Sequence, residues 1–233
     1  MSTVQPLLQV RALAGQRGDR RLFSGLDFSL NAGDIVWLRG RNGCGKTTLL
    51  RLLAGLASPE EGVIEIDGAP TAKAGTAWRR QLAYVAHGNA LKDDLSAVES
   101  LSFLARLHGA GAPDRMTLLQ ALRRLGVASR ADAPVRTLSQ GQRRRVALAR
   151  LALPGAARLW LLDEPFDALD DSGIVALNSL LAEHAGGGGA TLLTSHQPLS
   201  LQSPTPRVLD LDAAAPARES ASTSTSTAAA AAP

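Results

Sequence analysis

The sequence predicts an α/β fold built around a mainly parallel sheet. Three observations support this prediction: apolar strand-like segments alternate with helical segments, a glycine-rich loop joins one strand to a helix, and a long helical stretch separates two strands. Such alternation is typical of parallel sheets, because successive parallel strands need a crossover connection. The length of 233 residues suffices for one large domain of this class with an insert.

The first part of the chain is expected to form antiparallel strands before the parallel sheet begins. Short segments of alternating polarity predict the first strands, and an apolar segment after a turn at residues 31–34 predicts the strand that leads into the glycine-rich loop. The pair Asp67 and Gly68 is typical of a hairpin turn. The elements expected here are strands at 7–11, 26–30, 35–38, 63–66 and 81–85, and a helix at 47–56.

The middle of the chain is predicted to be a helical insert. From about Ser96 to Leu151 apolar residues recur with helical spacing, with breaks at residues 109–113, Gly126 and Pro134. The sheet is then expected to resume with strands at 159–162, 190–194 and 208–211. An amphipathic helix is expected at 170–184, ended by the glycines at 186–189.

These elements predict one domain over residues 1–212, with the helical subdomain at about 91–150 inserted in it. Residues 213–233 are rich in Ala, Ser, Thr and Pro and almost uncharged. Such a segment has too little bulky apolar surface to fold alone, so we expect a disordered tail. A frayed Ala-rich helix is the alternative.

The composition argues against several classes of protein. Aromatic residues make up 3% of the chain, too few for the stacking platforms that bind single-stranded nucleic acid. The one cysteine, Cys44, excludes an internal disulfide and a cysteine-based metal cage, and favours a reducing compartment. No apolar run approaches the roughly 18–20 residues that span a bilayer, and no secretion signal is recognisable. We therefore expect a soluble chain; its net charge of +4 by itself indicates no partner.

The glycine-rich loop after the strand at 35–38 carries the strongest chemical signal. It matches the pattern G-x-x-x-x-G-K-[S/T], in which glycines let backbone N–H groups surround a phosphate. Lys46 is expected to bridge the β- and γ-phosphates of a nucleotide, and Thr47 to hold Mg²⁺ through its hydroxyl. An accidental glycine turn is the alternative. Cys44 is expected to be a small packing residue, with a redox switch as its alternative. The candidate nucleotide-binding residues are Gly40, Arg41, Asn42, Gly43, Cys44, Gly45, Lys46, Thr47 and Thr48.

The apolar strand at 159–162 is followed by two carboxylates, Asp163 and Glu164. In a parallel sheet such a strand delivers its last side chains to the carboxyl edge, where nucleotides bind. Asp163 fits a carboxylate that helps Thr47 to hold Mg²⁺, and Glu164 fits a group that orients or deprotonates the attacking water. A strand that ends in Asp-Glu is weak evidence alone and becomes strong beside a phosphate loop.

Further motifs resemble the ATP-binding cassette family of P-loop NTPases. Residues 138–142, with the helix at 145–150, are similar to the signature motif of that family, and residues 167–170 to its D-loop. His196 is similar to its switch histidine. The motifs appear in the family's order and spacing from Gly40 to His196. Taken singly, Ser139 is equally an ordinary helix N-cap and His196 a polar loop residue.

This resemblance implies an ATPase that works as a head-to-tail homodimer, with two molecules of ATP and their Mg²⁺ ions between the chains. Glu164 and His196 would be the catalytic residues, and Asp170 would belong to the D-loop. The signature of one chain would contact the γ-phosphate bound by the other, so a monomer would bind ATP but hydrolyse it poorly. The signature residues are Ser139, Gln140, Gly141 and Gln142.

Three positions depart from the usual pattern of the family. His87 stands at the Q-loop position, where the family usually has glutamine, and Gln140 stands where the signature usually has its first glycine. No aromatic residue occurs near residues 17–20, where the adenine is usually stacked. An arginine plane is expected to stack there instead.

With these departures, the chain resembles one subgroup of the family, the ATP-binding subunits of the haem exporter of cytochrome c maturation. This resemblance implies a peripheral ATPase on the cytoplasmic face of the bacterial inner membrane, docked as a homodimer on permease subunits of the cytochrome c maturation complex. ATP would drive export of haem or release of a haem carrier. The similar stretches are residues 22–26, 30–33, 47–56, 91–92, 95–99, 163–166 and 194–199.

The insert at about 91–138 and the loop of His87 are expected to form the surface for the permease. Residues 143–145, all arginine, would face acidic partner groups or lipid headgroups, or simply solvent. Neither nucleic acid nor direct haem binding is expected, because the histidines are scattered. They are His87, His108, His184 and His196.

Other functions compete with haem export. The chain would also suit a different exporter, and a neighbouring permease gene would distinguish the two. A cassette that acts on DNA or ribosomes usually has a long coiled-coil insert or a second cassette, and neither is recognisable in the sequence. A module that only closes on ATP, without turnover, is disfavoured by Glu164.

Overall fold

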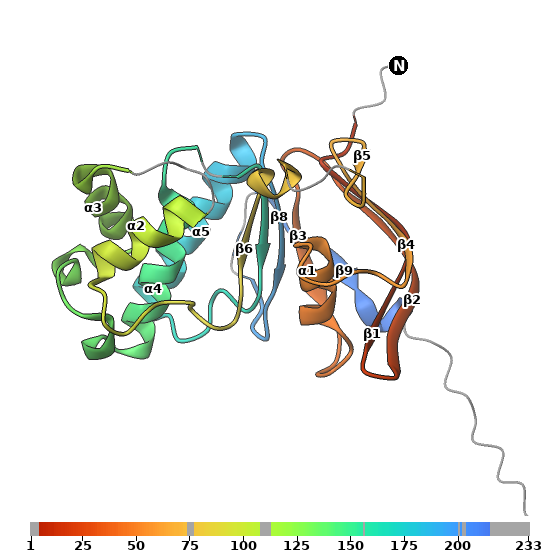
Figure 1. Ribbon diagram of the computed structural model, residues 1–233, viewed down its shortest axis with the longest axis horizontal. Helices are drawn as coiled ribbons and strands as arrows, with labels where there is room; N and C mark the ends of the chain where they lie inside the picture. Colours follow the sequence, from red (N-terminus) through yellow and green to blue (C-terminus); the bar gives the residue numbers. More distant parts are fainter. Residues whose placement is uncertain are drawn as a thin grey trace, which may run out of the picture.

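The computed structural model describes residues 5–73, 77–107, 113–155, 157–199, 201 and 204–214. An antiparallel sheet stands at one side of the molecule, and helix α1 (Lys46–Leu53) lies between it and a central parallel sheet (Figure 1). A group of helices covers the other face of the parallel sheet. These helices are α2 (Ala97–Leu107), α3 (Arg115–Arg124), α4 (Gln140–Ala149) and α5 (Asp171–Gly186).

The antiparallel sheet has the strand order β2-β1-β4-β5. Its first two strands are longer than the predicted 7–11 and 26–30. The pairing register shifts after Val10, so the alternation of polar and apolar residues breaks there although the strand continues. The hairpin turn is confirmed, with Asp67 and Gly68 both at positive φ. The strands are β1 (Leu8–Arg17), β2 (Arg20–Leu30), β4 (Glu61–Ile66) and β5 (Ala69–Pro70).

The parallel sheet confirms the predicted fold class, since every pair of neighbouring strands in it is parallel. Its centre is apolar on both faces. Leu159 and Leu161 pack on the α1 side, whereas Trp160 and Leu162 pack on the side of the other helices. This arrangement explains why the strand at 159–162 reads as a continuous apolar run. The strands, in sheet order, are β6 (Leu82–Val85), β7 (Leu159–Leu162), β8 (Ala190–Thr194), β3 (Ile35–Arg39) and β9 (Arg207–Asp210).

The helices follow the predicted pattern, with corrected ends. α1 was expected to reach residue 56 but ends at Leu53, because Gly55 adopts a left-handed φ of 65°. The breaks at Gly126 and Pro134 are confirmed, whereas the break at 109–113 falls mostly on residues outside the described part. Four short 3-10 turns lie in connections between these elements. They are η1 (Ala77–Gln81), η2 (Ala128–Arg130), η3 (Val135–Thr137) and η4 (Arg150–Ala152).

The described chain ends in a 3-10 turn, η5 (Leu211–Ala214), which spans the predicted start of the tail. Residues 215–233 of that tail, and His108, lie outside the described residues. Cys44 is a free thiol. Among the described helices, none combines the length and the apolar character needed to cross a membrane.

Candidate active site

The glycine-rich loop connects β3 to α1 at the carboxyl edge of the parallel sheet. Gly45 lies directly before α1 with a φ of 114°, and a Cβ atom there would come within 3.0 Å of the Phe23 ring. Gly40 has a φ of 147°, and its Cβ would lie 2.6 Å from the Sγ of Cys44. This loop shape therefore requires glycine at both positions, as a backbone cradle for a phosphate does.

Cys44 packs inside this loop, against Gly40. Burial raises the pKa of its thiol. A redox-sensitive cysteine needs the opposite shift, because the thiolate is the reactive form. The structure therefore favours the packing role for Cys44.

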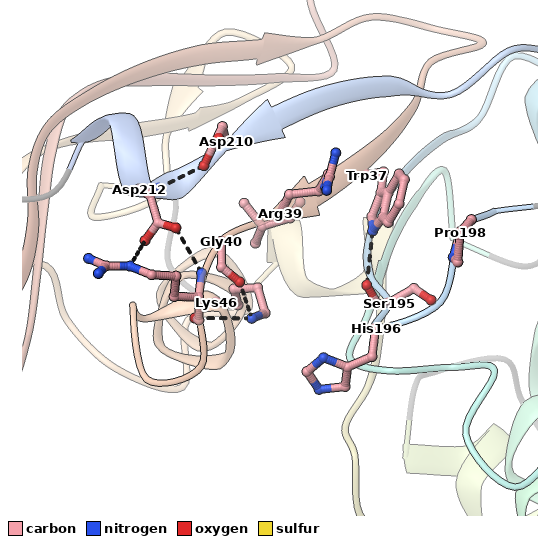
Figure 2. A pocket seen from close by; sticks show the side chains of 11 residues that line it. Trp37, Arg39, Gly40, Lys46, Ser195, His196, Pro198, Asp210 and Asp212 are labelled. Atoms are coloured by element: carbon pink, nitrogen blue, oxygen red, sulfur yellow. Dashed lines mark hydrogen bonds and ion pairs between the residues drawn. The ribbon is translucent and has the colours of Figure 1, made fainter.

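Lys46 begins α1 and turns its side chain back over the loop. Its Nζ donates hydrogen bonds to the carbonyl oxygens of Gly40 at 2.8 Å and Arg41 at 3.3 Å (Figure 2). The backbone N–H of Arg41 in turn donates to Asp212 Oδ2 at 2.9 Å, which ties the loop to η5, directly after β9. The ammonium group is thus placed at the centre of the loop, where it can meet a phosphate.

A hydrogen-bonded chain joins the phosphate loop to the ends of β7 and β8. Thr47 Oγ1 donates to Asp163 Oδ2 at 2.8 Å, and Thr194 Oγ1 donates to Asp163 Oδ1 at 3.0 Å. Both oxygens of the buried Asp163 carboxylate are therefore satisfied. Thr47 and Asp163 therefore lie side by side at the carboxyl edge of the parallel sheet, as expected from the sequence.

Glu164 is held in a strained and well-defined position. Its φ of 48° is a left-handed conformation that side chains other than glycine rarely adopt. Its N–H donates to Thr194 Oγ1 at 2.8 Å, and its Oε2 accepts a hydrogen bond from the backbone N–H of His196 at 3.0 Å. The His196 ring lies 3.5 Å from Oε1. Strain of this kind is typical of functional sites.

These groups line one cavity of about 420 Å³. The structure thus brings together most of the predicted nucleotide-binding and catalytic residues. Two further residues, Arg17 at the end of β1 and Leu22 of β2, border the same cavity. Arg17 therefore stands where an arginine plane was expected to replace the adenine-stacking aromatic. The predicted residues that line the cavity are Asn42, Gly43, Gly45, Lys46, Thr47, Thr48, His87, Asp163, Glu164 and His196.

Gly40 and Arg41 line an adjacent cavity of about 450 Å³, which shares Lys46 and His196 with the first (Figure 2). Trp37 forms part of its wall and donates through Nε1 to the carbonyl oxygen of Ser195 at 3.2 Å. This bond fixes the segment that leads from β8 to His196.

The signature lies apart from the phosphate loop. Ser139, Gly141 and Gln142 line a separate cavity of about 420 Å³, whereas Gln140 is not part of its lining. Ser139 caps α4: its Oγ accepts the N–H of Gln142 at 3.2 Å, and Gln142 Oε1 accepts the N–H of Ser139 at 3.0 Å. A Cβ at Gly141 would lie 2.6 Å from the carbonyl oxygen of Ala168. The signature and the segment at 167–170 are therefore packed against each other.

Asp170 completes this second cavity. The N–H of Gly173 and the Ser172 hydroxyl bind its carboxylate and, together with Arg145, lower its pKa. Arg145 donates to Asp170, to Ser172 Oγ at 2.6 Å and to the carbonyl oxygen of Leu125 at 3.0 Å. A charged donor set of this kind keeps the carboxylate ionised and fixed.

The expectation that residues 143–145 face a partner or solvent is wrong for two of the three arginines. Arg144 and Arg145 are buried, at 2% and 9% exposure, and bind groups of their own chain. Only Arg143 reaches the surface, where it pairs with Asp93 at 3.3 Å. Three consecutive arginines on a helix point in different directions, so the sequence pattern does not show which of them are buried.

His87 follows β6 and borders the same cavity as Lys46 and Glu164. It is largely exposed, and its Nδ1 lies 3.6 Å from Asp167 Oδ2. The residue at the Q-loop position is therefore next to both the nucleotide cavity and the D-loop segment.

Comparison with known proteins agrees with this geometry. Residues 23–167 match the protein family described as ABC transporter. The chain is 47% identical over 211 residues to the cytochrome c biogenesis ATP-binding export protein CcmA of Pseudomonas syringae, covering 91% of this chain and 98% of the relative. It is 46% identical over 195 residues to the CcmA of Escherichia coli O157:H7, covering 84% and 91% of the two chains.

Solved structures lead to the same family. A putative ABC transporter ATP-binding protein of Pyrococcus furiosus superposes with a TM-score of 0.76 and 26% identity, over 90% of this chain and 99% of that one. An ATP-binding cassette in a dimeric post-hydrolysis state, bound to ADP and Pi, superposes with a TM-score of 0.71 and 25% identity, over 82% and 88%. The chain therefore belongs to the ABC transporter family, in the branch of the cytochrome c biogenesis ATP-binding export proteins.

Proposed function

We propose that this chain is the ATP-hydrolysing subunit of a haem-export complex for c-type cytochrome biogenesis. The observation that carries the ATPase assignment is the placement of Glu164 beside the phosphate loop, with its carboxylate held by the N–H of His196. The export assignment rests on the relatives, which are named as export proteins of cytochrome c biogenesis.

In this proposal the phosphate loop binds the β- and γ-phosphates of ATP. Lys46 exchanges its bonds to Gly40 and Arg41 for bonds to phosphate oxygens, which are stronger because both partners are charged. Gly43 and Gly45 leave room for backbone N–H groups to point at the phosphates. Arg17, on the rim of the cavity, stacks on the adenine through its guanidinium plane.

Thr47 and Asp163 fit a Mg²⁺ ion. Their oxygens lie 2.8 Å apart at the base of the cavity, and a hydroxyl with a carboxylate is the hard oxygen donor set that Mg²⁺ prefers. No cluster of three or more His, Cys, Asp or Glu side chains in the described ranges is built to hold a metal unaided. Thr47 and Asp163 therefore suit an ion that the phosphates of the nucleotide also bind. Such an ion neutralises negative charge on the transferred phosphoryl group.

Glu164 is the group that accepts the proton of the attacking water. Its carboxylate is 9% exposed and opens toward the cavity that holds Lys46. His196 lies against it and is the donor placed to stabilise charge on the γ-phosphate. The N–H of His196 holds the carboxylate, and Thr194 Oγ1 holds the backbone N–H of Glu164, before substrate arrives. Little reorganisation is therefore needed during the reaction.

The second half of each site is proposed to come from another copy of the chain. The signature cavity lies apart from the phosphate loop in the same chain, and the related cassette noted above is dimeric with ADP and Pi. In a head-to-tail homodimer, Ser139, Gln140, Gly141 and Gln142 would meet the γ-phosphate of the partner's ATP, with Asp170 beside them. The free N–H groups at the start of α4 are suited to that anion.

The helical subdomain and the loop of His87 are proposed to bind permease subunits of the cytochrome c maturation complex. The subdomain exposes the apolar side chains of Phe103, Leu107 and Met116, of which Leu107 and Met116 are 64% and 60% exposed. These side chains offer apolar contacts to a protein partner. The chain would then be a peripheral subunit on the cytoplasmic face of the inner membrane, with neither haem nor nucleic acid bound directly.

A rescue experiment tests this function. The gene is deleted in its host, and covalent haem in c-type cytochromes is stained after return of wild type, Glu164→Gln or Glu60→Gln. Glu60 is an exposed glutamate outside the site and serves as the matched control. We expect loss of cytochromes on deletion and rescue by wild type and Glu60→Gln only.

The other outcomes are equally informative. Cytochromes that persist after deletion would contradict haem export and favour an ATPase for a different exporter. Rescue by Glu164→Gln would show that turnover is not needed, in favour of a module that only closes on ATP.

A further inference from the structure

Arg144 is a buried cation at the centre of the molecule. It lies in the first half of α4, and 2% of its surface is exposed. All three guanidinium nitrogens donate hydrogen bonds, and the acceptors belong to two segments that are far apart in the sequence.

The first segment is the end of β7, beside the catalytic carboxylate. Nη2 donates to the carbonyl oxygens of Asp163 at 2.9 Å and Glu164 at 2.7 Å, and Nε donates to that of Pro165 at 3.3 Å. The guanidinium therefore fixes the backbone on both sides of the Glu164 side chain.

The second segment is the loop of His87. Nη1 donates to the carbonyl oxygens of Ala86 at 2.9 Å and His87 at 3.3 Å, and to Asn89 Oδ1 at 3.2 Å. The guanidinium is planar and rigid, so this loop and the end of β7 cannot move independently while both keep their bonds to it.

A structural ion pair does not account for the burial of Arg144. Its acceptors are backbone carbonyls and one amide, and it forms no ion pair within the described ranges. Burial lowers its pKa, and the nearby carboxylates of Asp167, Asp163 and Glu164 counteract this shift. A buried charge is costly to desolvate, and here its hydrogen bonds are directed at backbone carbonyls rather than at a carboxylate, which indicates a role in fixing the backbone.

The backbone of Glu164 is a segment that needs to be fixed in this way. Its φ of 48° persists only if the surroundings hold it. The Thr194 hydroxyl holds the N–H of Glu164, and Arg144 holds its carbonyl oxygen. Loss of either contact allows the backbone to relax and moves the carboxylate.

We propose that Arg144 is a positioning residue, which fixes the backbone of Glu164 and couples it to the loop of His87. This inference rests on the proposed catalytic role of Glu164. Arg144 does not touch the ATP cavity, so it acts on hydrolysis and not on nucleotide binding. A displacement of the His87 loop by a bound partner changes the position of Glu164 through the same guanidinium.

The test compares Arg144→Lys with Arg123→Lys in the purified full chain. Lysine keeps the charge but has one nitrogen, which cannot bridge both segments. Arg123 is exposed on α3 and controls for the substitution itself. We expect Arg144→Lys to lower kcat about 10- to 100-fold, as a small misplacement of a catalytic group does. Affinity for a fluorescent ATP analogue should stay unchanged, and Arg123→Lys should behave as wild type.

Combination with Glu164→Gln separates positioning from a general structural effect. If Arg144 acts through Glu164, Arg144→Lys causes no further loss of turnover in the Glu164→Gln background. Multiplicative losses, wild-type kcat in Arg144→Lys, or a parallel loss of ATP affinity would each overturn the inference. Wild-type turnover in Glu164→Gln alone would instead contradict the proposed function.

A second pair of variants decides the question if Arg144→Lys does not fold. Asn89→Asp keeps a side-chain acceptor for Nη1 and Asn89→Ala removes it, at a partly exposed loop position. We expect a lower kcat at unchanged ATP affinity for the alanine variant only, with a smaller loss than in Arg144→Lys because Nη1 keeps its bonds to Ala86 and His87. Equal kcat in the two variants would refute the coupling.

Discussion

Thr194→Val tests the hydrogen bonds that hold the Asp163 carboxylate and the backbone of Glu164, with little change in the shape of the side chain. Thr194 is fully buried at the end of β8. Its hydroxyl accepts the N–H of Glu164 at 2.8 Å and donates to Asp163 Oδ1 at 3.0 Å. Thr194→Val leaves the first group without its acceptor and removes a donor from the second.

The expected loss of stability follows from these two bonds. A buried N–H without a partner costs about 1–3 kcal/mol, and a lost bond to a charged acceptor about 1.5–3 kcal/mol. The added methyl group returns about 1 kcal/mol through apolar burial. We therefore expect Thr194→Val to lower the free energy of unfolding by about 1.5–5 kcal/mol, or Tm by about 3–20 °C for a chain of this length.

Thr191 offers a matched control on the same strand. It is also fully buried, but its hydroxyl has no hydrogen-bond partner in the described part of the chain. Thr191→Val removes an unsatisfied polar group and should raise the free energy of unfolding by up to about 1 kcal/mol. Urea unfolding of both variants measures the difference. Equal changes in the two, or a stable Thr194→Val, would refute the account of the network.

Three other substitutions test separate parts of the molecule. Lys46→Ala should weaken ATP binding about 10- to 100-fold, because it removes a charged donor to phosphate; unchanged affinity in an ATP titration would contradict the loop assignment. Gly141→Ala, whose Cβ would lie 2.6 Å from the carbonyl of Ala168, should lose turnover but keep ATP affinity. Gly186→Ala, with no atom within 4 Å of its Cβ, is the control, and equal phosphate release by both would contradict the packing argument. His184 stacks on Trp160 with ring centroids 3.8 Å apart, and burial lowers its pKa. The His184 imidazole is therefore protonated more readily in the unfolded chain than in the folded chain. Its contribution to the free energy of unfolding is complete above a pH of about 6.5 and decreases as the pH falls below that value. His184→Phe should reduce that slope in urea unfolding at pH 5.5 and 7.5, and an unchanged slope would assign it to other groups.

Local patterns were sufficient to predict where the glycine-rich loop and the strand before Asp163 lie. The phosphate loop depends on glycines and one lysine within a few residues, and β7 on an apolar run that ends in Asp163. In both cases the residues that decide the structure are neighbours in the sequence. The prediction of β7 and β8 was correct to the residue for the same reason.

Features that depend on contacts between distant segments could not be predicted from the sequence. The extension of β1 past Arg11 follows from bulges that its partner strands accommodate. The burial of Arg144 depends on carbonyl groups that converge from β7 and from the loop of His87. No spacing along α4 indicates that such acceptors exist, so a charged residue in a helix was expected at the surface.

Two adjacent residues of α4, Arg144 and Arg145, bind groups beside two different cavities of the chain. Successive residues of a helix point about 100° apart, so the two side chains reach different neighbours. Arg144 binds the end of β7 beside the ATP cavity, and Arg145 binds Asp170 beside the signature cavity. In the proposed dimer these cavities serve different ATP molecules. In that arrangement Arg144 would act at the ATP bound by its own chain, and Arg145 at the ATP bound by the partner.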